Sequence, residues 1–105
     1  MTVSMGIRHL DTGQFEDVPV ATSEVFRSWW LPACKRLGLD LVSHFHDGML
    51  NTVANDEIPR IVAELEALRA WASAEPDRSF MVARIDGILQ AFRRTDPLRC
   101  SYDFG

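Results

Sequence analysis

Both ends of the chain show the alternation of apolar and polar residues that is typical of strands with one buried face. Apolar residues occupy every second position over residues 3–8 and again over residues 98–104. Successive side chains of a strand point to opposite faces, so this period of two predicts strands that are buried on one side only. The two strands are similar in length, which makes them candidates to pair with each other.

A hairpin is predicted after the first strand. Residues 10–14 contain Asp11, whose carboxylate can accept hydrogen bonds from a turn backbone, and Gly13, which can adopt a positive φ. Residues 15–20 are the expected return strand. Pro19 cannot donate to a ladder, so this segment is expected at an edge of the sheet or as an extended linker.

The first helix is predicted from about Thr22 to Gly38. Thr22 or Ser23 can cap its N-terminus, Glu24 lies favourably near the positive end of the helix dipole, and Gly38 is a suitable C-terminal stop. Pro32 deletes a backbone donor and clashes with the preceding turn. We therefore expect a kink or two short helices in this segment.

Residues 39–46 return to a period of two, which predicts a central strand. One side of this strand would carry Leu39, Leu41, Ser43 and Phe45, and the other Asp40, Val42, His44 and His46.

Two longer helices are predicted over residues 55–73 and 78–94. In both segments the apolar residues recur at spacings of three and four, which places them in one stripe along each helix. Pro59 is compatible with the first turn of its helix. The break over residues 74–77 is short, so the two helices are expected to form an antiparallel hairpin.

The predicted element order is β(β)αβααβ. Helices with one apolar stripe and strands with one apolar face must bury these surfaces against each other. The sequence therefore predicts an α+β fold with three helices packed on one face of a small three- to four-stranded sheet. The other face should stay in water and present Ser4, Arg8, Asp40, His44, His46, Arg99, Ser101 and Asp103.

Length and composition fit one globular domain. The chain has 105 residues, of which 47% are hydrophobic and 25% charged, and we expect a single domain over residues 1–105. Its first residues do not match a signal peptide, and no apolar run approaches the roughly 20 residues of a membrane span. We therefore expect a cytoplasmic protein with no membrane association. In that reducing compartment Cys34 and Cys100 should be free thiols.

The formal net charge of −4 comes from the first half of the chain. No Lys or Arg occurs between Arg36 and Arg60, although several carboxylates lie there. Nucleic-acid binding needs a clustered basic face, and the chain offers only three arginines close together near residue 95, so no nucleic-acid partner is expected. A basic protein, in contrast, would be steered towards the acidic stretch.

The run from His44 to Asp47 is the most suggestive of chemistry. On a strand, His44 and His46 would face the same way and could share one metal ion, with Asp47 as a further ligand. A metal site needs three or four ligands, and the sequence shows no diagnostic spacing for the others. The alternative interpretation is a solvated strand face. We expect no cofactor.

No residue of the sequence is a clear catalytic candidate. Cys34 precedes Lys35 and Arg36, whose charges would favour a thiolate, but a cysteine in an amphipathic helix usually packs as a small core residue. Cys100 lies on the apolar side of the last strand and is interpreted in the same way. Motifs of phosphate-binding loops, dinucleotide sites, serine hydrolases and zinc peptidases are absent from the sequence.

The two adjacent tryptophans are the remaining surface candidates. Trp29 and Trp30 would point about 100 degrees apart on a helix, so one of them should lie at the margin of the buried face. Tryptophan is enriched in recognition surfaces because it is mostly apolar and carries one donor.

Acidic charge without catalytic equipment favours a non-enzymatic protein-binding module with a basic partner. An immunity or antitoxin protein held against a cationic toxin is one instance, by functional analogy. One alternative is a small metal-dependent enzyme or metal sensor. The other is a homodimeric assembly subunit that uses the first helix. We therefore expect the chain to be a monomer or a homodimer. The predicted partner-binding residues are Trp30, Asp40, His44, His46, Asp47, Asp56 and Glu57.

Overall fold

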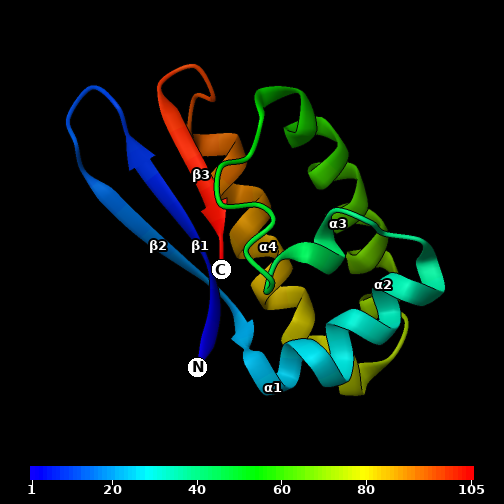
Figure 1. Cartoon of the computed structure of the whole chain (residues 1–105). Coiled ribbons are helices and arrows are strands. Elements are labelled where there is room, and N and C mark those ends of the chain that lie inside the picture. The colour runs from blue at the N-terminus through cyan, green and yellow to red at the C-terminus, as the bar shows by residue number, and fades with distance from the viewer.

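Three antiparallel strands form the sheet, with β1 (Thr2–His9) at its centre. The computed structural model describes residues 1–105 and places β2 (Phe15–Thr22) on one side of β1 and β3 (Cys100–Phe104) on the other. The first and last strands of the chain therefore pair directly. All helices lie on one face of this sheet (Figure 1), which confirms the predicted α+β class with three helices on one face.

The hairpin between β1 and β2 forms as predicted, and β2 is an edge strand. Gly13 adopts a φ of 75° in the connecting turn. The register of the pair shifts between Val3 and Ser4, opposite Pro19, so a bulge lies where the proline cannot donate to the ladder. A bulge and a proline on an edge strand discourage pairing with a further strand.

The first helical segment is continuous but changes its pitch. It runs from α1 (Ser23–Val25) through a π-helical turn (Phe26–Trp30) into α2 (Leu31–Leu37). Pro32 is the second residue of α2, and one residue, Leu31, separates it from the π-helical turn. Proline cannot donate a backbone hydrogen bond, and a π-helical turn accommodates this interruption of the regular hydrogen-bond pattern. The expected kink therefore takes the form of this widened turn.

Both ends of this helical segment are capped as predicted. The side chain of Thr22 accepts a hydrogen bond from the backbone N–H of Val25 at 3.1 Å. Gly38 adopts a φ of 72°, and its N–H donates to the carbonyl of Cys34. The left-handed backbone at Gly38 ends the helix and turns the chain towards the next segment.

The predicted strand at residues 39–46 is wrong. These residues form a turn that leads into a 3₁₀-helical turn (Val42–His44). The buried side chains follow a spacing of three, because residues i and i+3 share a face in a 3₁₀ helix. They are Leu39, Val42 and Phe45.

The two long helices form the predicted hairpin. They are α3 (Ile58–Ser73) and α4 (Ser79–Arg94), and a 3₁₀-helical turn (Pro76–Arg78) leads into α4. An ion pair joins the two helices, with Arg69 Nε 2.5 Å from Asp86 Oδ1. Their connection of five residues leaves no alternative to antiparallel packing.

The sheet has one buried and one open face, as predicted. The strand residues towards the helices belong to one cluster of 27 buried apolar residues and include Met5, Ile7, Tyr102 and Phe104. The open face carries Ser4, Arg8, Ser101 and Asp103, and Arg99 is exposed in the turn before β3. Three further residues were predicted on this open face, on the strand over residues 39–46 that does not form. They lie instead in the segment between α2 and α3 and are Asp40, His44 and His46.

Candidate functional site

Residues 38–57 connect α2 to α3, and we name this segment the acidic crossover. It contains four acidic residues and no Lys or Arg. In Figure 1 it runs from the end of α2 across the helices to the edge of β3, and then to the start of α3. Asp40, Asp47 and Asp56 are exposed and Glu57 is half-buried. The predicted carboxylates therefore all reach the surface from one segment.

Apolar anchors fasten the acidic crossover to the core. Besides these anchors, which are named below, two backbone hydrogen bonds join the segment to the outer edge of β3. Val53 N–H donates to Tyr102 O at 2.8 Å, and Phe104 N–H donates to Leu50 O at 2.9 Å. The crossover therefore covers this edge of the sheet. The anchoring side chains are at most 7% exposed and are Leu39, Val42, Phe45, Leu50 and Val53.

Carboxylates fix the backbone at both ends of the acidic crossover. Glu64 of α3 accepts hydrogen bonds from the N–H groups of Leu41 at 3.3 Å and Val42 at 3.0 Å. At the other end, Glu57 accepts from the N–H of Ala54 at 3.0 Å and closes a 3₁₀-helical turn (Asn55–Glu57). These contacts hold the segment in one conformation.

His44 and Asp47 form a local pair within the acidic crossover. His44 Nδ1 lies 2.6 Å from Asp47 Oδ2, and Asp47 Oδ1 accepts from the N–H of Met49 at 3.0 Å. Partial burial works to raise the pKa of Asp47, but the hydrogen bonds from His44 and Met49 outweigh it and hold that pKa below its usual value. Asp47 therefore stays ionised while it orders this turn.

The two histidines diverge, so the proposed metal pair does not form. His46 packs against Phe26, with ring centroids 5.0 Å apart, and its Nδ1 is buried without a hydrogen-bond partner. His44 points to Asp47 instead. No group of three or more His, Cys, Asp or Glu side chains is placed to hold a metal ion. The alternative based on His44, His46 and Asp47 depended on a strand that is absent, and the structure does not support it.

Trp30 is wrong as a surface candidate. It is fully buried and stacks on Phe26, with ring centroids 5.7 Å apart and planes 19° from parallel. The predicted marginal tryptophan is Trp29, which is 36% exposed and meets Phe80 edge to face at 5.3 Å. The sequence predicted that one of the two lies at the margin, but the residue selected for the partner-binding set, Trp30, is the buried one.

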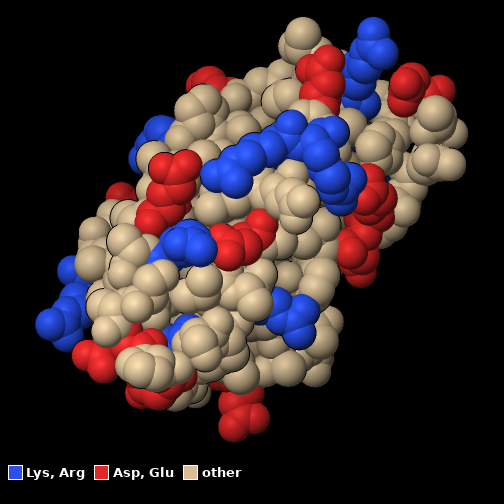
Figure 2. Space-filling model, turned by 180° about the vertical axis from the view of Figure 1, so that it is seen from behind, with Lys and Arg blue, Asp and Glu red and all other residues tan.

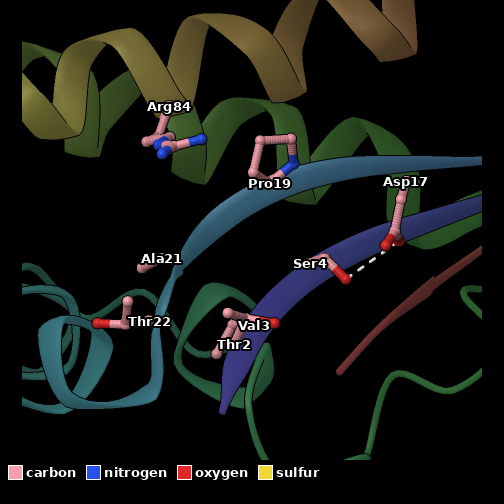
Figure 3. A pocket seen from close by; sticks show the side chains of 8 residues that line it. All are labelled: Thr2, Val3, Ser4, Asp17, Pro19, Ala21, Thr22 and Arg84. Carbon is pink, nitrogen blue, oxygen red and sulfur yellow. Dashed lines mark hydrogen bonds between the residues drawn. The ribbon is translucent and has the colours of Figure 1, made fainter.

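A shallow groove of about 300 Å³ lies along the end of β2 (Figure 3). Ser4 and Asp17 line it from β1 and β2 and are joined by a hydrogen bond of 3.1 Å. Arg84 reaches towards Pro19 from α4, on the opposite side of β2. The groove holds no histidine or cysteine, and its carboxylate is already bonded to Ser4. Its ionisable side chains are therefore Asp17 and Arg84, which lie on opposite sides of β2.

Sequence reasoning missed a connected polar cluster where β1 ends and β3 begins. Cys100 Sγ lies 3.5 Å from His9 Nδ1, and His9 Nε2 lies 2.5 Å from Glu16 Oε2. Arg94 of α4 donates to both oxygens of Glu16, at 2.7 and 3.2 Å. The hydrogen bond from Arg94, supported by that from His9, lowers the pKa of Glu16 to about 2. The available signal was His9 itself, a polar residue on the apolar side of the first strand.

Comparisons with known proteins add no functional information. No protein-family model matches the chain, and no curated protein or solved structure shows significant similarity to it. None of the helices combines the length and the apolar content that crossing a membrane requires.

Proposed function

We propose that the protein is a non-enzymatic protein-binding module that recognises a basic protein through the acidic crossover. The observation that carries this proposal is the location of the net charge. The chain has fifteen acidic and eleven basic residues, and four of the acidic ones lie in the crossover. The eleven acidic residues elsewhere balance the eleven basic ones, so the formal charge of −4 resides in this segment.

The ion pairs of the structure leave the charge of the crossover available. Arg69, Arg94 and Arg99 pair with carboxylates outside the segment. Within it, only Asp47 forms an ion pair, and its partner is His44 rather than an arginine or lysine. On the face of the molecule turned away from the viewer of Figure 1, basic and acidic side chains are interspersed (Figure 2). Such a mixed surface attracts a charged partner less than a segment of one sign.

Anchoring supports recognition because it reduces the entropy lost on binding. The buried side chains and the Glu64 and Glu57 contacts already order the acidic crossover in the free protein. Binding to a surface that is already ordered loses less conformational entropy than binding to one that must first become ordered. Asp40 and Asp56 make no side-chain hydrogen bond or ion pair within the molecule, so their carboxylates can accept bonds from a partner's lysines and arginines.

A cationic protein is therefore the partner class that fits this surface. Opposite charge accelerates the encounter and discriminates against acidic partners, while the final affinity depends on close contacts at the centre of the interface. An immunity or antitoxin role against a cationic toxin is one biological form of such a pair.

The test compares two variants that each lose four negative charges, at different places on the molecule. The crossover variant carries Asp40→Asn, Asp47→Asn, Asp56→Asn and Glu57→Gln, which retain an oxygen acceptor at each position. The control variant carries Asp11→Asn, Glu24→Gln, Glu66→Gln and Glu75→Gln, at exposed positions without ion pairs. Each variant and the wild type are immobilised, and an extract of the source cells is passed over them at low salt.

We expect a protein of basic isoelectric point to be retained by the wild type and by the control variant but lost from the crossover variant. Far-ultraviolet circular dichroism verifies that both variants keep their helix content. Retention of the same proteins by all three forms, or of no protein by the wild type, contradicts the proposal.

A further inference from the structure

We propose that Cys100 is a nucleophilic thiol with His9 as its general base and Glu16 as the positioning residue, and that it takes a small α,β-unsaturated carbonyl compound as a covalent ligand. The site lies outside the acidic crossover, and the inference goes beyond the proposed binding function. A nucleophile is recognised by a base within hydrogen-bond reach that is itself oriented by a third group. The chain from Cys100 through His9 to Glu16 has this form.

The pairing of Glu16 with Arg94 determines which nitrogen of His9 carries the proton. Arg94 donates hydrogen bonds to both oxygens of Glu16. Together with the hydrogen bond from His9, these bonds lower the pKa of this carboxyl to about 2. At neutral pH Glu16 is therefore a carboxylate, which can only accept hydrogen bonds. Since His9 Nε2 lies 2.5 Å from it, Nε2 must carry the hydrogen. The lone pair of neutral His9 is then on Nδ1, which faces the sulfur of Cys100.

Besides His9, Arg94 and Tyr102 are groups that interact with Cys100. Arg94 contributes a guanidinium from α4. Tyr102 of β3 lies beside Cys100, and its hydroxyl is already hydrogen-bonded to Thr95 at 2.7 Å. In the turn before β3, Arg99 lies 4.0 Å from Asp96, so these two charges offset each other.

Cys34 provides a natural contrast within the same chain. Its thiol packs in the core, where burial, supported by the negative charge of Glu64, raises its pKa to about 12. No histidine forms a hydrogen bond with it, in contrast to Cys100. The two free cysteines therefore have opposite environments, one against a base and one against a carboxylate.

Conjugate addition is a reaction that these groups can complete without an oxidant or a reductant. The thiol proton passes to His9 Nδ1 as the sulfur forms a bond to the β-carbon of the ligand. The π electrons of the carbon–carbon double bond move towards the carbonyl, which becomes an enolate. The imidazolium then returns the proton to the α-carbon. The product is a thioether, and His9 is neutral again.

Exposure limits the size of the ligand. Cys100 is 6% exposed, whereas the imidazole of His9 is 24% exposed, so solvent meets the base before the sulfur. A small uncharged compound fits this approach better than a large or anionic one. Acrylamide has the required chemistry and is the probe for the test.

The folded protein is incubated with acrylamide at pH 7, and adducts at each cysteine are quantified by peptide mass spectrometry. We expect Cys100 to react at least about tenfold faster than Cys34, and the variant His9→Asn to react at least about tenfold more slowly at Cys100. Between pH 6 and 8 the wild-type rate should depend less steeply on pH than the His9→Asn rate, because His9 removes the thiol proton during the attack, whereas the variant depends on thiolate formed without it. Glu16→Gln should move the wild-type profile towards that of His9→Asn.

Labelling of Cys34 serves as the control for folding, because this thiol becomes reactive only if the core opens. A variant in which Cys34 stays unlabelled is folded. A separate variant, Arg94→Lys, tests whether a single positive charge is enough to keep Glu16 in place. Equal rates at Cys100 in the wild type and a folded His9→Asn protein would overturn the proposal. So would equal rates at Cys100 and Cys34 in the wild type.

Discussion

The ring of Phe45 lies flat on the ring of Phe104, with centroids 3.8 Å apart and planes 4° from parallel. Phe45 belongs to the acidic crossover and Phe104 to β3, and both are at most 1% exposed. This stack joins the irregular segment to the sheet at its buried face. The position of the surface carboxylates therefore depends on a contact in the core.

Phe45→Ala should lower the free energy of unfolding by about 3 to 5 kcal/mol, the usual cost of deleting a buried phenyl ring. Met49, which is 71% exposed in the same segment, provides the control. Met49→Ala should change the stability by less than about 0.5 kcal/mol. Urea denaturation measures both, and a loss below about 1 kcal/mol for Phe45→Ala would show that the crossover is not anchored in this way.

The two tryptophans should respond very differently to truncation. Trp30→Ala removes a fully buried ring from its stack on Phe26 and should cost about 3 to 5 kcal/mol. Trp29→Ala removes an exposed edge-to-face contact with Phe80 and should cost only about 1 kcal/mol. Thermal or urea unfolding of the two variants gives the comparison. Similar losses would contradict the assignment of Trp30 to the core and Trp29 to the margin.

Acid should weaken the contacts of Glu16. Its pKa is about 2 in the folded protein, against an ordinary value of 4.5, because Arg94 and His9 bind the carboxylate. A lowered carboxyl pKa stabilises the fold above the unfolded value, and this contribution is lost as the pH falls from about 4.5 towards 2. The stability difference between the wild type and Glu16→Gln should therefore shrink over this range in urea titrations. Glu66→Gln, which alters a carboxylate without an ion pair, should show no such convergence.

Alkali should weaken the contribution of Cys34. Burial raises the pKa of its thiol from 9.0 to about 12, so above pH 9 the unfolded chain loses this proton before the folded one does. Stability must then fall with rising pH between about 9 and 12, by at most about 1.4 kcal/mol per pH unit for one group. The stability of Cys34→Ala should decline less steeply over this range. Parallel curves for the wild type and the variant would contradict a buried, neutral Cys34.

Long periodic segments allowed most of the fold to be predicted. The stripes of α3 and α4 extend over four turns each, and Thr22 and Gly38 mark the ends of the first helical segment, so these elements follow from local physics. The strand prediction for residues 39–46 was wrong because a short run with many apolar residues fits both a period of two and a period of three. Alternation suggested a strand, whereas burial of every third residue produced a 3₁₀-helical turn. Only contacts with β3 and α3 select between the two.

The Cys100 cluster could not be predicted because it requires strand order and register. His9 faces Cys100 only because β1 pairs with β3, and Glu16 reaches His9 only across the hairpin. Arg94 joins them from a helix that is distant in sequence from β2. The acidic crossover, in contrast, is contiguous in sequence, so its carboxylates were found from composition although its backbone was predicted incorrectly.

Titration of the purified basic partner into the protein tests the central claim most directly. Dissociation constants are measured by calorimetry for the wild type, the crossover variant and the control variant, at about 50 and about 300 mM salt. We predict that the crossover variant binds at least about tenfold more weakly than the wild type, that the control variant stays within about threefold, and that high salt weakens wild-type binding. Equal affinity of the wild type and the crossover variant would contradict recognition through this segment.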